Sequence, residues 1–253
     1  MMILVSVLLP TNKVNQYLYK SIDSILNQEF TELELILVLN GSALEKKMEL
    51  EARYINNIKV KILISKILHI NHSLNIGIDH AVGKYIARMD ADDIAHPDRI
   101  SIQYKFLENN PQVVVCGSFF ELINSDGVAI KQIKRKISTV EIRRSLIYRN
   151  PLCHPSVMFR CDDVRRVGGY LNGEYAEDYD LWVRLARDPK IEFANIPNYL
   201  LGYRSFSTGN SRGSKKAYQS ISSTQWREWC RSGDPRWLFA AIMSLTKAVL
   251  IGS

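Results

Sequence analysis

The chain has 253 residues, of which 46% are apolar and 23% charged, a composition typical of a globular protein with a sizeable core. Its formal net charge is only +7, and net charge alone is weak support for nucleic-acid binding, so we expect no nucleic-acid partner. None of the four cysteines forms a CxxC pair, which argues against a zinc site. They are also too few and scattered for a disulfide framework, which favours a reducing compartment. The first ten residues lack the basic start of a signal peptide, and no apolar run is long enough to predict an ordinary spanning helix.

Strand and helix patterns alternate through the first part of the chain. Continuous apolar runs, the first of them ended by Pro10, predict fully buried parallel strands, and apolar residues at helical spacing lie between them. We expect strands at 3–9, 33–39, 58–64 and 84–89, and helices at 17–28, 44–54 and 73–81. This alternation predicts an α/β fold with a mostly parallel sheet covered by helices on both faces.

The second part of the chain is less regular. We expect helices at 97–109, 140–148 and 177–187, and strands at 113–123, 128–133, 156–159, 191–196 and 199–203. The first two of these strands flank Ser125-Asp126-Gly127, a hairpin signal. Two closing helices, at 215–231 and 237–251, are separated by Gly233-Asp234-Pro235.

An acidic segment, Asp90-Ala91-Asp92-Asp93, directly follows the fourth predicted strand. Ligands of open α/β sheets bind outside the carboxyl ends of the strands, so these acids lie where a ligand is expected. Carboxylate oxygens suit Mg²⁺ or Mn²⁺, which bind through one or two carboxylates together with substrate phosphates. The alternative is a solvated acidic turn, because Asp is common in turns.

A second acidic cluster, Glu177, Asp178 and Asp180, opens a predicted helix. Acids at a helix start are stabilised by the positive end of the helix dipole. One acid that faces a cleft can have its pKa raised by the others, as a general base requires. The alternative is ordinary charge at the amino end of a helix.

Several separated segments together resemble the family-2 inverting glycosyltransferases of the GT-A fold. The resemblance covers roughly residues 3 to 204 and includes both acidic clusters. Its segments are 5–12, 21–28, 34–42, 74–78, 81–87, 90–93, 97–99 and 177–182, in the family's order and spacing. It implies a Rossmann-like sheet in a GT-A catalytic domain at 1–210, with a nucleotide-sugar-binding half at 1–100 and an acceptor-binding half at 101–210, followed by a helical tail at 211–253.

The resemblance also implies roles for individual residues. Asp178 is the expected catalytic base, and Asp92 and Asp93 are expected to hold Mg²⁺ or Mn²⁺. The expected contacts to the nucleotide sugar are Pro10, Thr11, Asn12, Asn40, Asn75, Asp90 and Asp92. Glu177, His154 and Trp182 are placed on the acceptor side, although a structural role suits His154 equally and a core role suits Trp182 better.

Three positions depart from the family pattern. Asn40, preceded by Leu39, stands where an acid usually contacts the nucleotide, which leaves the base preference open. Leu74 replaces an Arg that often precedes Asn75, and Phe206 lies where a His is common near the end of the catalytic domain.

The implied reaction is an inverting transfer of a sugar from a nucleoside diphosphate, with UDP expected, to a hydroxyl of a glycan acceptor. The implied setting is surface polysaccharide synthesis in the cytoplasm, at the inner face of the cell membrane, on an acceptor carried by a lipid diphosphate. A sugar-phosphate nucleotidyltransferase is disfavoured because residues 10–15 contain no glycine for a phosphate loop. Retention of both acidic clusters argues against a non-catalytic sugar-nucleotide-binding protein.

The carboxyl-terminal segment is both basic and apolar. Residues beyond 211 carry a net charge of +5, and the apolar run at 237–251 is too short to span a bilayer comfortably. Basic residues and tryptophans beside an apolar helix suit peripheral association with an anionic membrane surface. The alternative is that this helix packs on the catalytic domain or against a second subunit in a homodimer.

Overall fold

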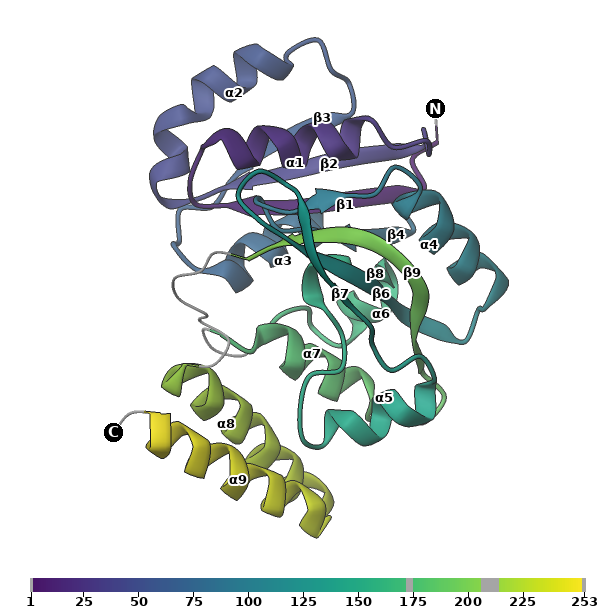
Figure 1. Cartoon of the computed structure of the whole chain (residues 1–253), viewed down its shortest axis with the longest axis vertical. Helices are drawn as coiled ribbons and strands as arrows, with labels where there is room; N and C mark the ends of the chain where they lie inside the picture. The colour runs from purple at the N-terminus through teal and green to yellow at the C-terminus, as the bar shows by residue number, and fades with distance from the viewer. Residues whose placement is uncertain (1, 172–174, 206–213, 252–253) are drawn as a thin grey trace.

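The computed structural model describes residues 2–171, 175–205 and 214–251. One sheet runs through the described part of the chain, with helices against both of its faces (Figure 1). Its amino-terminal half contains parallel strands in the order β3-β2-β1-β4. These strands are β1 (Val5–Thr11), β2 (Leu33–Leu39), β3 (Val60–Ile64) and β4 (Tyr85–Arg88).

Helices connect these parallel strands, and side-chain caps fix where two of them begin. Asn15 accepts hydrogen bonds from the backbone of Tyr17 and Leu18 at the start of α1, and His69 caps α3 in the same way. The connecting elements are α1 (Gln16–Leu26), the 3₁₀ turn η1 (Gly41–Lys46), α2 (Lys47–Tyr54) and α3 (Ile70–His80). The predicted alternation of strand and helix is thereby confirmed for this half.

The other half of the sheet is mixed rather than parallel. β8 lies antiparallel between β4 and β6, whereas β9 runs parallel to β6. The remaining strands are β5 (Ile94–Ala95), β6 (Val113–Ile123), β7 (Ala129–Ile133), β8 (Met158–Arg160) and β9 (Glu192–Arg204). The helices are α4 (Arg99–Asn109), α5 (Thr139–Leu146), η2 (His154–Ser156), α6 (Cys161–Arg166), α7 (Glu177–Leu185), α8 (Lys215–Ser232) and α9 (Pro235–Ile251).

Three details differ from the sequence prediction. The two strands expected at 191–196 and 199–203 form one continuous strand, β9, whose register against β6 shifts near Ser118 and Phe119. Pro197 and Asn198, which separate the two expected strands, fall at this shift, between the paired residues Ile196 and Tyr199. β5 and α6 were not predicted, because two and six residues are too few for a periodic signal.

The buried side chains form two large clusters, one on each face of the sheet. Successive side chains of β1 point to opposite faces, so Val7 and Leu9 join one cluster while Leu8 joins the other. Helix α1 covers the first cluster through Ile22, and α3 covers the second through Leu74. Burial on both faces explains the continuous apolar runs.

Helix α8 attaches the closing helices to the rest of the chain. Arg227 forms an ion pair of 2.6 Å with the fully buried Asp180 of α7, and the side-chain amide of Gln225 donates to the carbonyl of Ile147. Helix α9 lies on the far side of α8, where Ser244 donates to Gln225 (Figure 1). No helix in the described ranges combines the length and apolarity needed to cross a bilayer.

Gly83 permits the close packing of β1 against the turn that enters β4. A Cβ atom at Gly83 would lie 2.6 Å from the backbone nitrogen of Ser6 and 2.8 Å from the carbonyl carbon of Val5. The Ser6 hydroxyl donates to Glu34 of β2 and accepts from the Gly83 amide, so this contact joins three segments.

We expect Gly83→Ala to lower the free energy of unfolding by about 1–3 kcal/mol, because the backbone of β1 cannot move away without breaking the sheet. Urea denaturation measures this change. The neighbouring Val82→Ala is the control: Val82 is 63% exposed, so its effect should remain within about 0.5 kcal/mol. Equal stability of the two variants would contradict the argument.

Candidate active site

The acidic segment lies at the carboxyl end of β4, next to the end of β1. Asp90 and Asp92 are half-buried, whereas Asp93 is completely buried. One carboxylate oxygen from each of the three lies within 4.8 Å of the others. The structure thus gathers the predicted acids into one cluster, with the spacing that a single cation would require.

Two arginines compensate the negative charge of this cluster. Arg88, only 4% exposed, forms an ion pair of 2.5 Å with Asp90. Arg204, at the end of β9, donates its backbone N–H to an Asp93 carboxylate oxygen at 2.8 Å and its Nε–H to the Asp92 carbonyl at 2.7 Å. The other Asp93 carboxylate oxygen, Oδ2, is buried and has no hydrogen-bond partner among the described residues.

Burial and the repulsion of neighbouring carboxylates favour protonation of Asp92 and Asp93. Burial, followed by the charge of Asp90, raises the pKa of Asp92 to about 6. The same two causes, with Asp92 added, raise the pKa of Asp93 well above its usual range. Positive charge at this position would therefore stabilise the ionised form of the cluster.

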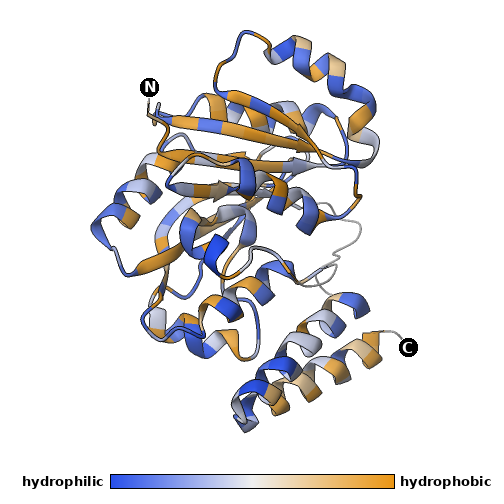
Figure 2. Cartoon of the chain, turned by 180° about the vertical axis from the view of Figure 1, so that it is seen from behind, coloured by the Kyte–Doolittle hydropathy of each residue, from blue (hydrophilic) through white to orange (hydrophobic). Residues whose placement is uncertain are grey.

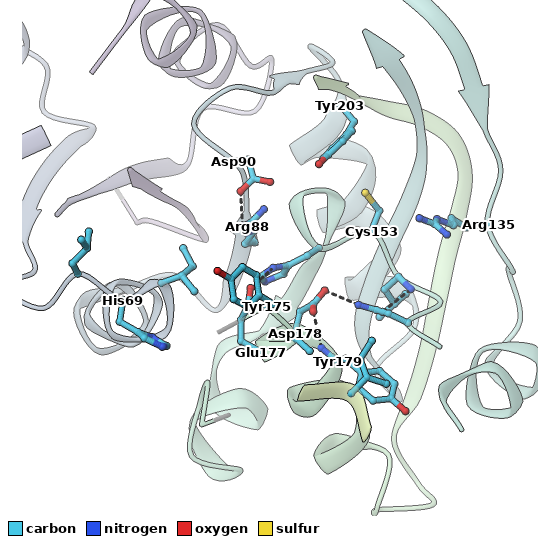
Figure 3. A pocket seen from close by; sticks show the side chains of 17 residues that line it. His69, Arg88, Asp90, Arg135, Cys153, Tyr175, Glu177, Asp178, Tyr179 and Tyr203 are labelled. Carbon is cyan, nitrogen blue, oxygen red and sulfur yellow. Dashed lines mark hydrogen bonds and ion pairs between the residues drawn. The ribbon is translucent and has the colours of Figure 1, made fainter. Parts of the chain in front are cut away.

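The second acidic cluster faces the first across a cavity of about 520 Å³ (Figure 3). Arg88 and Asp90 line this cavity from the end of β4, and Glu177 and Asp178 line it from the first turn of α7. We call this cavity the cleft. Because its lining combines carboxylates with cations and aromatic rings, it suits a polar ligand that carries both hydroxyl and phosphate groups.

Asp178 is held in position by two hydrogen bonds. Its Oδ1 accepts from the backbone N–H of Tyr179 at 2.7 Å, and its Oδ2 accepts from the side-chain amide of Asn150 at 2.6 Å (Figure 3). Asn150 also lines the cleft and lies in the segment between α5 and η2. The carboxylate is thus oriented before any ligand arrives.

Glu177 and His154 form a second polar pair at the cleft. Burial, together with the charge of Asp178, raises the pKa of Glu177 to about 7. The Nδ1 atom of His154 lies 3.7 Å from the Glu177 carboxylate, and its Nε2 lies 2.8 Å from the Tyr170 hydroxyl. His154 therefore lines the cleft and also supports the surrounding structure through Tyr170. The position expected on the acceptor side and the structural role are compatible with each other.

Eight predicted site residues do not line this cavity: Pro10, Thr11, Asn12, Asn40, Asn75, Asp92, Asp93 and Trp182. For Asn40, Asn75 and Trp182 the structure shows another role. Asn40 is buried and donates its amide to the Ser73 hydroxyl. The side-chain amide of Asn75 donates to the backbone carbonyl of Tyr170 and accepts from its backbone N–H, both at 2.9 Å. Trp182 is fully buried between the rings of His154 and Phe159, so stacking on a sugar is corrected to a core role.

The predicted nucleotide loop lies at the end of β1, next to the acidic cluster. Pro10 and Thr11 are buried in the strand itself, and Asn12 is exposed just beyond it. The Asn12 carbonyl accepts from the amide of Ala43, which joins this loop to the end of β2. Phe206, the position where the family pattern has a His, lies outside the described residues.

Sequence reasoning missed several polar residues of the cleft, among them Arg88, Arg135, Asn150 and Tyr203. Arg88 carried a signal, because a charged residue that ends a buried strand needs a compensating partner. Asn150, Arg135 and Tyr203 lie far from both acidic clusters in the sequence and reach the cleft only through the fold.

Comparisons with known proteins agree with this geometry. The family model "Glycosyl transferase family 2" matches residues 6–168. The O-antigen biosynthesis glycosyltransferase WbnJ of Escherichia coli is 33% identical over 230 residues, which cover 90% of this chain and 89% of WbnJ. The amylovoran biosynthesis glycosyltransferase AmsE of Erwinia amylovora is 31% identical over 192 residues, covering 75% of this chain and 71% of AmsE.

Solved structures share the fold at low sequence identity. S. aureus TarS superposes with a TM-score of 0.69 at 13% identity, covering 98% of this chain and 71% of that structure. The mannosyltransferase PcManGT from Pyrobaculum calidifontis, in complex with GDP-Man and Mn²⁺, superposes with a TM-score of 0.70 at 17% identity, covering 99% and 74%. The predicted GT-A type of α/β fold is confirmed, and the chain belongs to glycosyl transferase family 2.

Proposed function

We propose that this glycosyltransferase transfers a sugar from a nucleoside diphosphate to an acceptor hydroxyl with inversion at the anomeric carbon. One observation carries the proposal: the oriented carboxylate of Asp178 and the acidic cluster at Asp90 line the same cleft. Of the two other described carboxylates in the lining, Asp90 is paired with Arg88 and Glu177 has a raised pKa that favours its neutral form. Asp178 is therefore the oriented base and neither neighbour is a ready nucleophile, so a single displacement fits best.

In this mechanism Asp178 accepts the proton of the acceptor hydroxyl as that oxygen attacks the anomeric carbon. The hydrogen bond from Asn150 holds the carboxylate in the orientation needed for that transfer. Glu177, with its raised pKa, lies beside it and bonds to the hydroxyls of the acceptor sugar. Arg88, at the end of β4 on the facing side of the cleft, places positive charge toward the departing diphosphate.

The acidic cluster fits a bound Mg²⁺ or Mn²⁺. Its three carboxylates approach one another closely, and the buried Oδ2 of Asp93 has no other partner among the described residues. Asp92 and Asp93 would hold the ion, which when bound neutralises charge on the leaving diphosphate. Asp90, held by Arg88, remains available to the ribose of the donor.

The donor nucleotide is proposed to be a UDP-sugar. TarS has been solved in complex with UDP-GlcNAc, and that structure matches this chain with a TM-score of 0.68 at 15% identity. PcManGT in complex with GDP-Man shows that the same fold also accepts a guanine nucleotide. The choice of UDP therefore needs a direct test.

The acceptor is proposed to be a growing glycan on a lipid diphosphate at the cytoplasmic face of a membrane. The relatives WbnJ and AmsE are named for the synthesis of O-antigen and amylovoran. The exposed apolar residues of α9 supply a surface for peripheral association.

A donor panel with product analysis tests the proposed reaction. We expect one nucleotide sugar to be hydrolysed or transferred in the presence of Mg²⁺ or Mn²⁺, and an α-linked donor to give a β-linked product. The anomeric coupling constant in the proton NMR spectrum measures the configuration. An α-linked product would exclude single displacement.

We expect Asp92→Ala to abolish transfer and the metal-dependent part of nucleotide binding, because it removes a carboxylate that would contact the ion. Calorimetric titration of the nucleotide with and without Mn²⁺ separates that part from the rest. Asp79→Ala, which removes an exposed acid of α3 outside the cleft lining, is the matched control and should retain both. Undiminished activity of the wild type in excess EDTA would refute a metal requirement.

We expect Asp178→Asn to lower kcat by about 10² or more while donor binding stays close to normal, because the amide keeps the shape but cannot accept the proton. Steady-state kinetics with the donor identified above measures both parameters. Asp163→Asn, in α6 and away from the cleft lining, is the control. A decrease of only a few-fold would assign the base to another residue.

Asn150→Ala should lower kcat by about 10- to 100-fold with little change in the donor KM, since it removes a hydrogen bond to a charged group. The double variant with Asp178→Asn distinguishes positioning from a separate role. If Asn150 acts through Asp178, its substitution will have little further effect in that background. Additive losses would show that Asn150 contributes independently.

A further inference from the structure

Helix α9 has an apolar face that no described residue covers. Its inner face, formed by Ala240, Ala241, Ser244 and Ala248, is buried against α8. Large apolar side chains on the opposite face are more than half exposed: Phe239 (58%), Ile242 (54%), Val249 (60%) and Leu250 (69%). In Figure 2 this helix is mostly orange, beside the bluer α8.

A second cavity, of about 450 Å³, lies at the edge of this face between α9 and the end of α5. Its lining includes Arg144, Tyr148, Arg149, Met243, Ser244 and Lys247. We call it the basic pocket, because three cations and no acid of the described ranges line it. Met243 is also 41% exposed, so the pocket opens beside the apolar face of the helix.

The cations of the basic pocket differ from the other cations near the closing helices. Arg227 and Arg231 form ion pairs with acids of the buried network, and Arg236 pairs with Asp234. By contrast, Arg144 and Arg149 are exposed and form no ion pair within the described ranges. Lys247 lies 5.8 Å from the ring centroid of Tyr218 and likewise forms no ion pair with a described acid.

We propose that the basic pocket binds the phosphate headgroup of an anionic membrane lipid while the exposed face of α9 enters the acyl boundary. Cations beside an inserted apolar face bind anionic lipid surfaces, since the phosphate is held where the chains begin. This inference rests on the membrane association proposed above. It assigns that association to the basic pocket and the exposed face of α9 rather than to the overall charge of the tail.

A second copy of the chain fits this surface less well. A two-fold interface would bury the same apolar face from both subunits and would bring the same three cations with it. No described acid lines the pocket to neutralise them. An anionic lipid surface covers the apolar side chains and compensates the cations together.

The test is sedimentation of the full chain with phosphatidylcholine vesicles, with and without phosphatidylglycerol. The triple variant Arg144→Gln, Arg149→Gln and Lys247→Gln removes the pocket's cations. Each such residue near an anionic surface contributes about fivefold, so we expect about 100-fold weaker binding to the anionic vesicles only. The control triple variant Lys20→Gln, Lys105→Gln and Lys131→Gln changes the net charge equally at exposed sites outside the pocket lining, and it should bind within a few-fold of wild type.

Other outcomes would overturn the assignment. An equal loss in the control variant would mean that overall charge, not the pocket, binds the membrane. Saturable binding of inorganic phosphate without vesicles, lost in the pocket variant, would identify a soluble phosphate as the ligand. A dimer in solution that Ile242→Ser dissociates would assign the apolar face to a second copy.

The vesicle-binding result can be interpreted independently of the proposed sugar transfer. Transfer to a short soluble acceptor should be the same in wild type and in both triple variants, because none of the substituted residues lines the cleft. If no sugar transfer is found while only the pocket variant loses vesicle binding, the proposed reaction fails and the headgroup site stands. If transfer proceeds but the pocket variant binds anionic vesicles like wild type, the headgroup site is refuted.

Discussion

Charge compensation at the end of β4 is the constraint on which the site depends. Three carboxylates that lie together, one of them completely buried, repel one another unless cations or hydrogen-bond donors are supplied. Arg88 supplies a cation from the strand itself, whereas Arg204 reaches the cluster from the end of β9. The charge of the acidic cluster is therefore fully compensated only when β9 is paired with β6 and β5, which brings Arg204 to the end of β4.

The segment between α5 and η2 links the chemistry of the cleft to the closing helices. Asn150 orients Asp178, Arg149 lines the basic pocket, and the carbonyl of Ile147 accepts from Gln225 of α8. Four consecutive residues thus contact the proposed base, the proposed lipid site and the attachment of the tail. This arrangement places the proposed membrane surface close in the chain to the position where the acceptor hydroxyl would be deprotonated.

Only part of the positive charge beyond residue 211 is available to a binding partner. Arg227 compensates Asp180, which is fully buried in α7, and the buried Glu228 is shared between Arg187 and Arg231. The pairs Arg227–Asp180 and Arg187–Glu228 hold α8 against α7 and the segment after it, whereas Arg231 pairs within α8. Arg227 and Arg231 are therefore not free to attract a membrane. The sequence count of +5 overstates the charge available to a partner, because most of the described arginines of the tail are satisfied within the chain.

The sequence by itself determined the elements whose signals are local. Continuous apolar runs identified the parallel strands, and acids directly after one of them located the candidate metal site at 90–93. Adjacent residues likewise placed Glu177 and Asp178 at the start of a helix. Tertiary structure decided what depends on distant segments meeting. It set that Asn150 orients Asp178 and that Arg144 and Arg149 lie with Lys247 beside α9. It also set that Asn40 and Asn75 bond to neighbouring segments and that Trp182 is buried in the core. The physical reason is that a residue type and its spacing along the chain fix periodicity and local charge, whereas burial and the choice of a polar partner are set by packing.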